Sequence, residues 1–176
     1  NLWLIFYKYT KKNTTKKQHP KMYGELFDTI SLCLSKGLGA PVGSVLLSDK
    51  VTINKALRIR KILGGGMRQI GYLAAAGLFA LEHNIERLAE DHRRAKELGD
   101  LLNNLPWVAT VEPVETNILI FSVQSSIDEN QLMQKLNQKG IAISSMGHGK
   151  LRIVTHVDYR EVMHSYVLET LEKLEV

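Results

Sequence analysis

The stretch Ser31–Ser48 constrains the fold more than any other part of the chain. A short apolar run, Ile30–Leu34, is typical of a buried strand, and a second run, Val45–Leu47, follows after a turn rich in glycine and proline. Lys36 is the only cation in this stretch. The pattern therefore predicts two interior strands joined by a hairpin-like turn, with a lysine at its mouth.

A lysine in that position has two interpretations. An ammonium held between interior strands is partly desolvated, and desolvation favours the neutral amine that Schiff-base chemistry needs. The neighbouring glycines would let a flat or phosphorylated ligand approach the backbone closely. However, Ser-Lys-Gly is a short motif, and an ordinary loop lysine fits it equally well. The residues of this stretch leave both interpretations open.

The charge of the chain is concentrated at its start. Residues 1–21 hold six lysines and no acidic residue, so they contribute +6 to a net charge of +5, and the remaining residues sum to −1. The near-neutral body gives no case for nucleic acid. Asn1–Tyr9 is apolar but too short to span a bilayer and lacks the flanks of a signal peptide, so we expect no membrane association. The basic stretch is either a polyanion-binding arm, a disordered extension or a reading-frame boundary.

Length and cysteine usage narrow the class further. A chain of 176 residues that is 44% hydrophobic can bury a core in one or two small domains. Its one cysteine, Cys33, lies inside the first apolar run, which argues against a disulfide framework or a cysteine-based metal site. We therefore expect a reducing compartment, the cytoplasm, and no metal.

Two helices should follow the lysine turn. Val51–Lys61 has the pattern of a short amphipathic helix, and Gly64–Gly66 then interrupts the chain before a second helical pattern opens at Met67. Three glycines before a helix start could form an anion cradle, because free N–H groups and the helix dipole point at that spot. A flexible joint between helices is the alternative. The flanking basic residues are Arg60, Lys61 and Arg68.

The second helix is rich in small residues from Gly71 to Ala80, which suggests close packing against another element or another subunit. A break is expected near His83 and Asn84. The segment from Ile85 to Leu105 then has helical spacing with charges between the apolar residues. We expect its histidine, His92, to be solvated.

After Pro106 the pattern changes to a ββαββα order, which predicts a compact α+β domain with a mainly antiparallel sheet. Ser126 and Asp158 are the expected N-caps of its two helices. The expected strands are Trp107–Val111, Asn117–Val123, Ile141–Ser144 and Leu151–His156, and the expected first helix is Ile127–Lys139.

The last of these strands carries Arg152. Alternation places Arg152, Val154 and His156 on one face and Leu151, Ile153 and Thr155 on the other. A guanidinium in a strand usually has a partner. A substrate carboxylate would be bound bidentately, whereas a structural ion pair would serve only the fold. The strand itself does not decide between the two.

Four segments together resemble one known family. They are Ser-Lys-Gly-Leu-Gly-Ala-Pro-Val-Gly-Ser (35–44), Arg-Lys-Ile-Leu-Gly-Gly-Gly-Met-Arg-Gln (60–69), Leu-Ala-Ala-Ala-Gly (73–77) and Leu-Arg-Ile-Val-Thr-His (151–156). In this order they are similar to the low-specificity L-threonine aldolases, which are pyridoxal-phosphate enzymes of the aspartate-aminotransferase fold type I. The resemblance runs from about Phe27 to the C-terminus.

The resemblance implies a fold and an activity. It implies the C-terminal part of a fold type I large domain followed by a small α+β domain, with pyridoxal 5'-phosphate as cofactor. Lys36 would hold the cofactor as a Schiff base, and the enzyme would cleave a β-hydroxy-α-amino acid such as L-threonine to glycine and acetaldehyde. That reaction belongs to threonine catabolism and glycine biosynthesis.

The resemblance also implies roles for other residues. Arg152 would bind the substrate carboxylate, and Lys61 and Arg68 match basic residues near the cofactor phosphate or at a subunit interface. Family members are homo-oligomers, dimers or tetramers, with active sites shared across a dimer interface.

The sequence departs from the family before Lys36. The acidic residue that pairs with the pyridine nitrogen, the ring-stacking histidine and the phosphate loop have no counterpart, since Asp28 lies too close to Lys36 to serve. We therefore expect a truncated, feebly active or inactive form. Its parts would be a non-family, disordered leader (1–22), a partial cofactor-binding domain (23–105) and the small domain (106–176). The alternative is a non-enzymatic fragment that associates with a full-length aldolase subunit or binds a polyanion through its tail.

Overall fold

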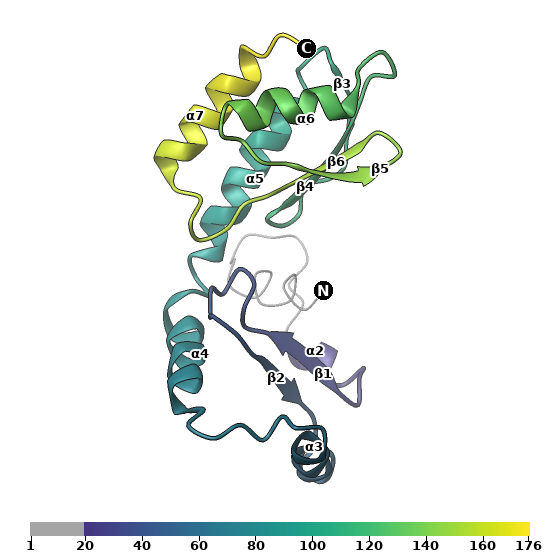
Figure 1. The fold of residues 1–176 in the computed structure, drawn as a ribbon. Helices are drawn as coiled ribbons and strands as arrows, with labels where there is room; N and C mark the ends of the chain where they lie inside the picture. Colours follow the sequence, from purple (N-terminus) through teal and green to yellow (C-terminus); the bar gives the residue numbers. More distant parts are fainter. Residues whose placement is uncertain (1–19) are drawn as a thin grey trace. The chain divides into compact units, whose positions relative to one another are not determined.

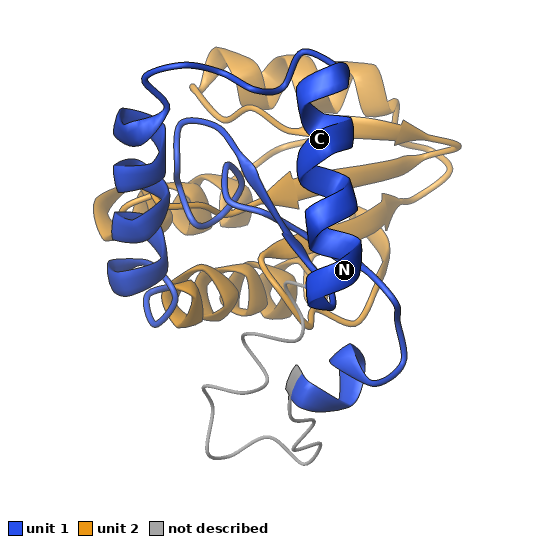
Figure 2. Ribbon diagram, turned by 90° about the horizontal axis from the view of Figure 1, so that it is seen from below, with its two compact units in different colours: residues 1–87 blue, residues 88–176 orange. Residues whose placement is uncertain are grey.

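The computed structural model describes residues 20–176, and the chain divides into two compact units, Asn1–Arg87 and Leu88–Val176 (Figures 1 and 2). The basic stretch that the sequence assigned to a leader lies almost wholly outside the described residues. Of that stretch, the structure describes a short helix, α2 (Pro20–Gly24). None of the helices described in this chain is long and apolar enough to cross a membrane.

The N-terminal unit holds one hairpin and two longer helices. Strands β1 (Ile30–Cys33) and β2 (Ser44–Leu47) form the antiparallel hairpin that the sequence predicted. In its register, Ile30 lies opposite Leu47 and Cys33 opposite Ser44. Helices α3 (Lys50–Ile62) and α4 (Gly71–His83) follow. Asp49 caps α3, because its carboxylate accepts the N–H of Thr52 at 2.9 Å.

The two strands are not interior, and this corrects the prediction from their apolar sequences. Leu32 is buried, but Leu46 and Leu47 are more than 40% exposed. A two-stranded sheet can bury both faces only if other elements cover it, and within the described residues no further strand pairs with this hairpin. Apolar content alone does not reveal whether such a cover exists.

The C-terminal unit is a four-stranded antiparallel sheet with three helices on one face (Figure 1). Its elements are α5 (Leu88–Leu102), β3 (Val108–Val111), β4 (Ile118–Val123), α6 (Glu129–Gln138), β5 (Ser144–Gly147), β6 (Lys150–Val154) and α7 (Glu161–Glu172), with strand order β3-β4-β6-β5. The ββαββα order and the antiparallel sheet are confirmed. The first helix of this unit, α5, precedes that order in the chain.

One apolar core joins the sheet to the three helices. Leu119 and Phe121 of β4 and Leu151 of β6 point into it, and each is at most 1% exposed. The helices contribute Leu98, Leu102, Leu132, Leu136, Val167 and Leu171. Because α5 supplies part of this core, the structure divides the chain between Arg87 and Leu88, whereas the sequence placed the boundary at residues 105 and 106.

The structure changes several local predictions in this unit. The N-cap of α6 is Asp128, whose carboxylate accepts two backbone N–H groups, and α7 begins after Arg160 without a side-chain cap. Strand β5 starts at Ser144, where Ile141–Ser144 had been expected. His92 is 5% exposed, so it is a buried residue of α5 and not a solvated one.

Candidate active site

The loop that carries Lys36 is fixed by its backbone. The carbonyl oxygen of Lys36 accepts the N–H of Gly39 at 2.8 Å. The N–H of Leu34 donates to the carbonyl of Gly43 at 2.9 Å, and the carbonyl of Leu34 accepts the N–H of Ala40 at 3.0 Å. Asn84, which follows α4, donates from Nδ2 to the carbonyl of Leu38 at 2.7 Å. The loop therefore has a defined path. A lysine needs such a path if it is to meet a ligand at a fixed position.

Lys36 itself is exposed, while its neighbours anchor the loop. Leu34, Leu38 and Ala40 are each less than 10% exposed and hold the loop down on its unit. The predicted desolvation of Lys36 is thus not provided by residues 20–176, which leave the hairpin beside it largely uncovered. What the structure provides is an accessible amine on a turn held by backbone hydrogen bonds and buried neighbours.

Cys33 and Ser35 lie next to Lys36. The Sγ atom of Cys33 is 3.3 Å from the Ser35 hydroxyl oxygen. This hydrogen bond lowers the pKa of the Cys33 thiol, burial acts in the opposite direction, and the charge of Lys36 lowers the pKa further. The pKa of this half-buried thiol thus depends mainly on its contact with Ser35 and less on the charge of Lys36.

The three glycines after α3 form a helix C-cap. The N–H of Gly65 donates to the carbonyl of Arg60 at 2.8 Å, and the N–H of Gly64 donates to that of Lys61 at 3.2 Å. With Gly64 at φ +82°, this is the Schellman arrangement. Since these two N–H groups are used and α4 starts only at Gly71, they do not form the anion cradle that the sequence left open.

The glycine run also lets α3 side chains lie close to the backbone. A Cβ atom at Gly66 would stand 2.5 Å from Cδ of Lys61, so glycine is needed there for the present position of that side chain. Lys61 and Arg68 are both exposed. Their predicted role near a phosphate or at a subunit interface stays a prediction.

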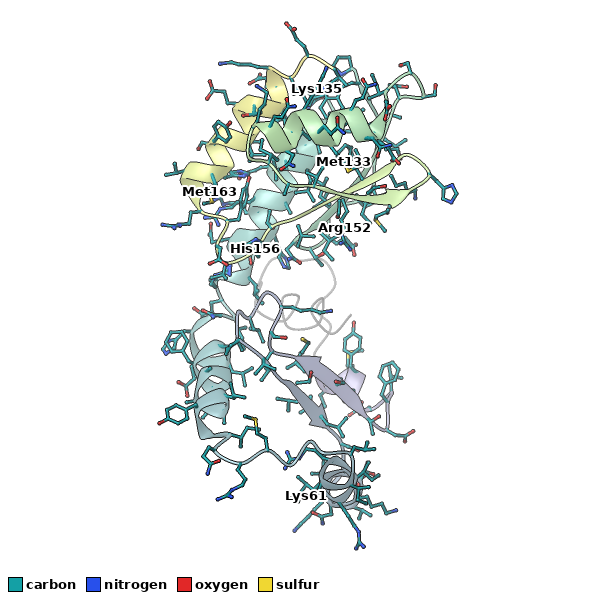
Figure 3. All side chains as sticks on the ribbon, viewed as in Figure 1. Lys61, Met133, Lys135, Arg152, His156 and Met163 are labelled. Carbon is teal, nitrogen blue, oxygen red and sulfur yellow. The ribbon has the colours of Figure 1, made fainter. Side chains whose placement is uncertain are left out.

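Arg152 lies on the face of the C-terminal sheet that none of the unit's helices covers (Figure 3). Its cross-strand neighbours are Ile120 on β4 and Ser144 on β5. The predicted alternation is confirmed, since Arg152, Val154 and His156 are exposed whereas Leu151 and Thr155 are buried. Within residues 20–176 the guanidinium has no hydrogen bond and no ion pair, so the part of the chain that the structure describes supplies no structural partner for it.

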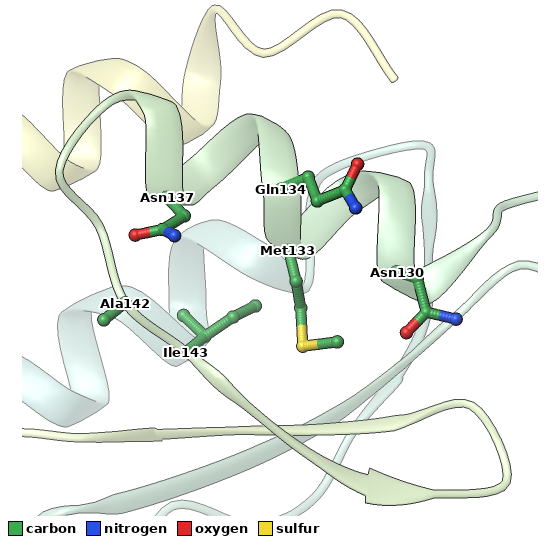
Figure 4. Close-up of a pocket in the computed structure, with 6 residues that line it drawn as sticks. All are labelled: Asn130, Met133, Gln134, Asn137, Ala142 and Ile143. Atoms are coloured by element: carbon green, nitrogen blue, oxygen red, sulfur yellow. The ribbon is translucent and has the colours of Figure 1, made fainter.

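The cavities in each unit involve other residues. In the C-terminal unit a cavity of about 340 Å³ lies between α6 and the segment before β5 (Figure 4), lined by Asn130, Met133, Gln134, Asn137, Ala142 and Ile143. In the N-terminal unit a cavity of about 410 Å³ lies at the Ile30–Leu47 end of the hairpin, next to Asp28 and Asp49. Lys36 and Arg152 line neither of these cavities.

Sequence reasoning missed a polar network between α5 and α7. His164 is 2% exposed, with Nε2 2.7 Å from a carboxylate oxygen of Glu97 and Nδ1 3.1 Å from the Tyr159 hydroxyl. Arg93 pairs with Glu97 at 2.8 Å and with Glu161 at 2.7 Å. Burial raises the pKa of Tyr159 to about 12, and Arg93 and His164 hold the pKa of Glu97 below its usual range against the effect of burial. The spacing of Arg93 and Glu97 was the only signal, because the other partners are far apart in sequence.

Comparison with solved structures identifies the fold. The chain matches a candidate L-allo-threonine aldolase from Listeria monocytogenes EGD-E with a TM-score of 0.74 and 20% identity, covering 98% of this chain and 50% of that one. It matches a decarboxylase from Sulfurospirillum multivorans with a TM-score of 0.66 and 18% identity, covering 96% and 45%. The chain therefore has the mixed α/β fold of about half of each of these two proteins, in agreement with the predicted fold class.

Sequence comparison then defines the family. The model of the beta-eliminating lyase family matches residues 12–126, and this chain belongs to that family. The match begins ahead of the boundary at residue 22 that the sequence predicted. The chain is 43% identical over 132 residues to low-specificity L-threonine aldolase 1 of Arabidopsis thaliana, and 41% identical over 133 residues to the low specificity L-threonine aldolase of Escherichia coli K12.

The chain spans only part of these relatives. The matched region covers 73% of this chain and 37% of the Arabidopsis thaliana protein, and 74% and 38% for the Escherichia coli protein. The resemblance to threonine aldolases that the four sequence segments indicated is therefore confirmed. The activity of a whole enzyme of this kind is therefore proposed, and not stated as fact, for this chain.

Proposed function

We propose that this chain carries part of the active site of a pyridoxal-phosphate-dependent aldolase that cleaves L-threonine and L-allo-threonine to glycine and acetaldehyde. The observation that carries the proposal is the exposed amine of Lys36 on a turn fixed by Gly39 and Asn84, within the region that matches the family. The identity to named L-threonine aldolases supports the choice of substrate.

The residues described here fit the cofactor in part. Lys36 offers an accessible primary amine, which is the group that carbonyl cofactors attach to. Asp28, the acid closest before it in sequence, lies at the opposite end of β1, beside the Ile30–Leu47 pair. When bound, pyridoxal phosphate supplies an electron sink for breaking the bond between Cα and Cβ. Lys61 and Arg68 are candidates for holding its phosphate.

Arg152 would bind and orient the substrate. A guanidinium without an acidic partner in residues 20–176 can donate two parallel hydrogen bonds to a carboxylate, which fixes the orientation of an amino acid around its Cα. The reaction needs that orientation, because only the bond held perpendicular to the electron sink is weakened. Atoms balance without a further reactant, since threonine divides into glycine and acetaldehyde.

A spectroscopic experiment tests this role of Lys36. The purified 176-residue chain mixed with pyridoxal phosphate should develop the absorbance band of the lysine-bound cofactor, and Lys36→Ala should abolish it. Lys55→Ala on α3, another exposed lysine of the same unit, is the matched control and should keep the band. A band that survives Lys36→Ala, or its absence from the unaltered chain, would contradict the proposal. Turnover of threonine by the chain alone should be weak or absent.

A second function is favoured by the exposed apolar surface of the N-terminal unit. Leu26, Leu63 and Tyr72 are 73%, 79% and 87% exposed. Surfaces of this kind usually meet another protein, so the chain would act as a non-enzymatic fragment that associates with a full-length aldolase subunit or with its own copies as a dimer or tetramer. Light scattering on the pure chain, and on its mixture with an intact aldolase, distinguishes these assemblies from a monomer.

The basic stretch of residues 1–21 could bind a polyanion, which salt-sensitive binding to nucleic acid would reveal.

We further place the activity in the cytoplasm. The lone cysteine, which has no disulfide partner, supports a reducing compartment. Fractionation of cells that express a tagged chain tests this location.

A further inference from the structure

Two basic side chains of one strand share the open face of the C-terminal sheet. Lys150 and Arg152 are two residues apart on β6, so both side chains leave the sheet on the same face, about 7 Å apart along the strand. A ligand with two carboxylates could bind both cations at once. A ligand with one carboxylate needs only one of them.

Lys150 is already paired with an acid. Its Nζ lies 2.7 Å from Oε1 of Glu112. Glu112 directly follows β3, and its N–H donates to the carbonyl of Ile120 at 2.9 Å, which holds its backbone against β4. Because β4 lies between β3 and β6, the Glu112 side chain reaches across the same open face. Arg152, by contrast, has no acidic partner in residues 20–176.

We infer that Glu112 is a specificity-determining residue that, by pairing with Lys150, denies dicarboxylates a second cation on the Arg152 face and so removes their advantage over monocarboxylates. By pairing with Lys150 it leaves Arg152 as the β6 cation without an acidic partner among residues 20–176. The second carboxylate of a dicarboxylate ligand, if it lay near Lys150, would find the ammonium already paired with the negatively charged Glu112. The inference rests on the proposed function, in which Arg152 binds the substrate carboxylate. It names the ligands of this face as amino acids that gain nothing from a second carboxylate.

The expected size of the effect follows from exposure. The side chains of Lys150 and Glu112 are 50% and 46% exposed, so water and salt screen their interaction. Replacing the carboxylate of Glu112 by an amide should therefore raise the affinity for a dicarboxylate by about threefold, a shift typical of one exposed charge pair. The affinity for a monocarboxylate should change little, because Arg152 itself is not altered.

Ligand titrations of the full chain without pyridoxal phosphate test the inference. Acetate and succinate are added at constant ionic strength while the backbone amide resonances of β6 are followed by nuclear magnetic resonance. The unaltered chain should bind the two with affinities within about twofold. Glu112→Gln should gain about threefold for succinate only. Lys150→Gln in the Glu112→Gln background should remove that gain, and Arg152→Gln should weaken both ligands.

A second exposed pair provides the control. Glu169 on α7 and Lys173, the C-cap of that helix, are paired at 2.6 Å. Glu169→Gln therefore also frees a lysine, but at a helix end and not beside an arginine on a strand. An equal gain for succinate in Glu169→Gln, or no gain in Glu112→Gln, would overturn the inference. So would undiminished binding by Arg152→Gln. None of these titrations involves Lys36, so a failed cofactor band and a failed succinate gain are separate results.

Discussion

At the scale of single residues, the environment of Lys36 is set by contacts made around it and not by its own burial. Leu34, Leu38 and Ala40 are buried and hold the turn, while the amine stays exposed. The thiol of Cys33 is coupled to this site through the hydroxyl of Ser35. The thiol therefore offers a chemical probe for the electrostatics of the turn, one that works without any cofactor.

The pH dependence of Cys33 alkylation tests that coupling. The folded state lowers the pKa of this thiol, with the Ser35 hydrogen bond as the main cause and Lys36 as a weaker one. The thiolate should therefore form at a lower pH in the folded chain than in the chain unfolded in urea, and the midpoint of the alkylation rate should be lower accordingly.

Variants separate the contributions to this midpoint. Ser35→Ala should raise it most, Lys36→Met should raise it less, and Ser44→Ala, which removes the weakest contribution, should raise it least. An unchanged midpoint in Ser35→Ala would show that the hydroxyl does not stabilise the thiolate. Iodoacetamide labelling followed by mass spectrometry gives the rates.

At the scale of elements, one close contact determines how α5 packs on the sheet. Gly99 is buried on α5, and a Cβ atom there would lie 2.7 Å from Cγ2 of Val114 and 3.3 Å from Cδ1 of Leu119. Glycine is normally unfavourable inside a helix, so the close approach to Val114 in the β3–β4 loop and to Leu119 on β4 explains this residue. The same helix then presents Glu97 and Arg93 to α7.

Gly99→Ala should destabilise the C-terminal unit. Alanine improves helix propensity, but the added methyl group must displace Val114, and overpacking of this kind costs about 1–3 kcal/mol. Urea unfolding should show a lower midpoint with an unchanged slope. Lys96→Ala, at an exposed position of the same helix, is the matched control and should leave the midpoint nearly constant. A Gly99→Ala variant as stable as the control would mean that α5 does not approach the sheet this closely.

At the scale of the whole molecule, the two units differ in how much apolar surface they bury by themselves. The C-terminal unit has one continuous core of buried residues from Leu98 to Leu174. The N-terminal unit buries Leu32, Leu34, Leu38 and Ala80 but exposes large apolar residues on α3 and α4. Helix α4 has apolar residues on all its faces, and this pattern is typical of helices that other elements cover on every side.

This difference predicts how isolated pieces of the chain behave. A fragment of residues 88–176 should fold alone, with a cooperative thermal transition followed by circular dichroism. A fragment of residues 20–87 should show no such transition and should bind the dye ANS, because its few buried residues cannot offset the conformational entropy of folding. Cooperative unfolding of residues 20–87 without dye binding would contradict this view.

Sequence alone determined the order of elements, the antiparallel sheet, the alternation that exposes Arg152 and the family resemblance that singles out Lys36. These features depend on local periodicity and on motifs a few residues long. Tertiary structure decided the exposure of the β1–β2 hairpin, the burial of His92, the use of Gly64 and Gly65 as a helix cap, and the pairing of Glu112 with Lys150. Each of these depends on which distant segment lies against a residue. A linear pattern carries that information only weakly, because several partners can satisfy the same apolar or charged side chain.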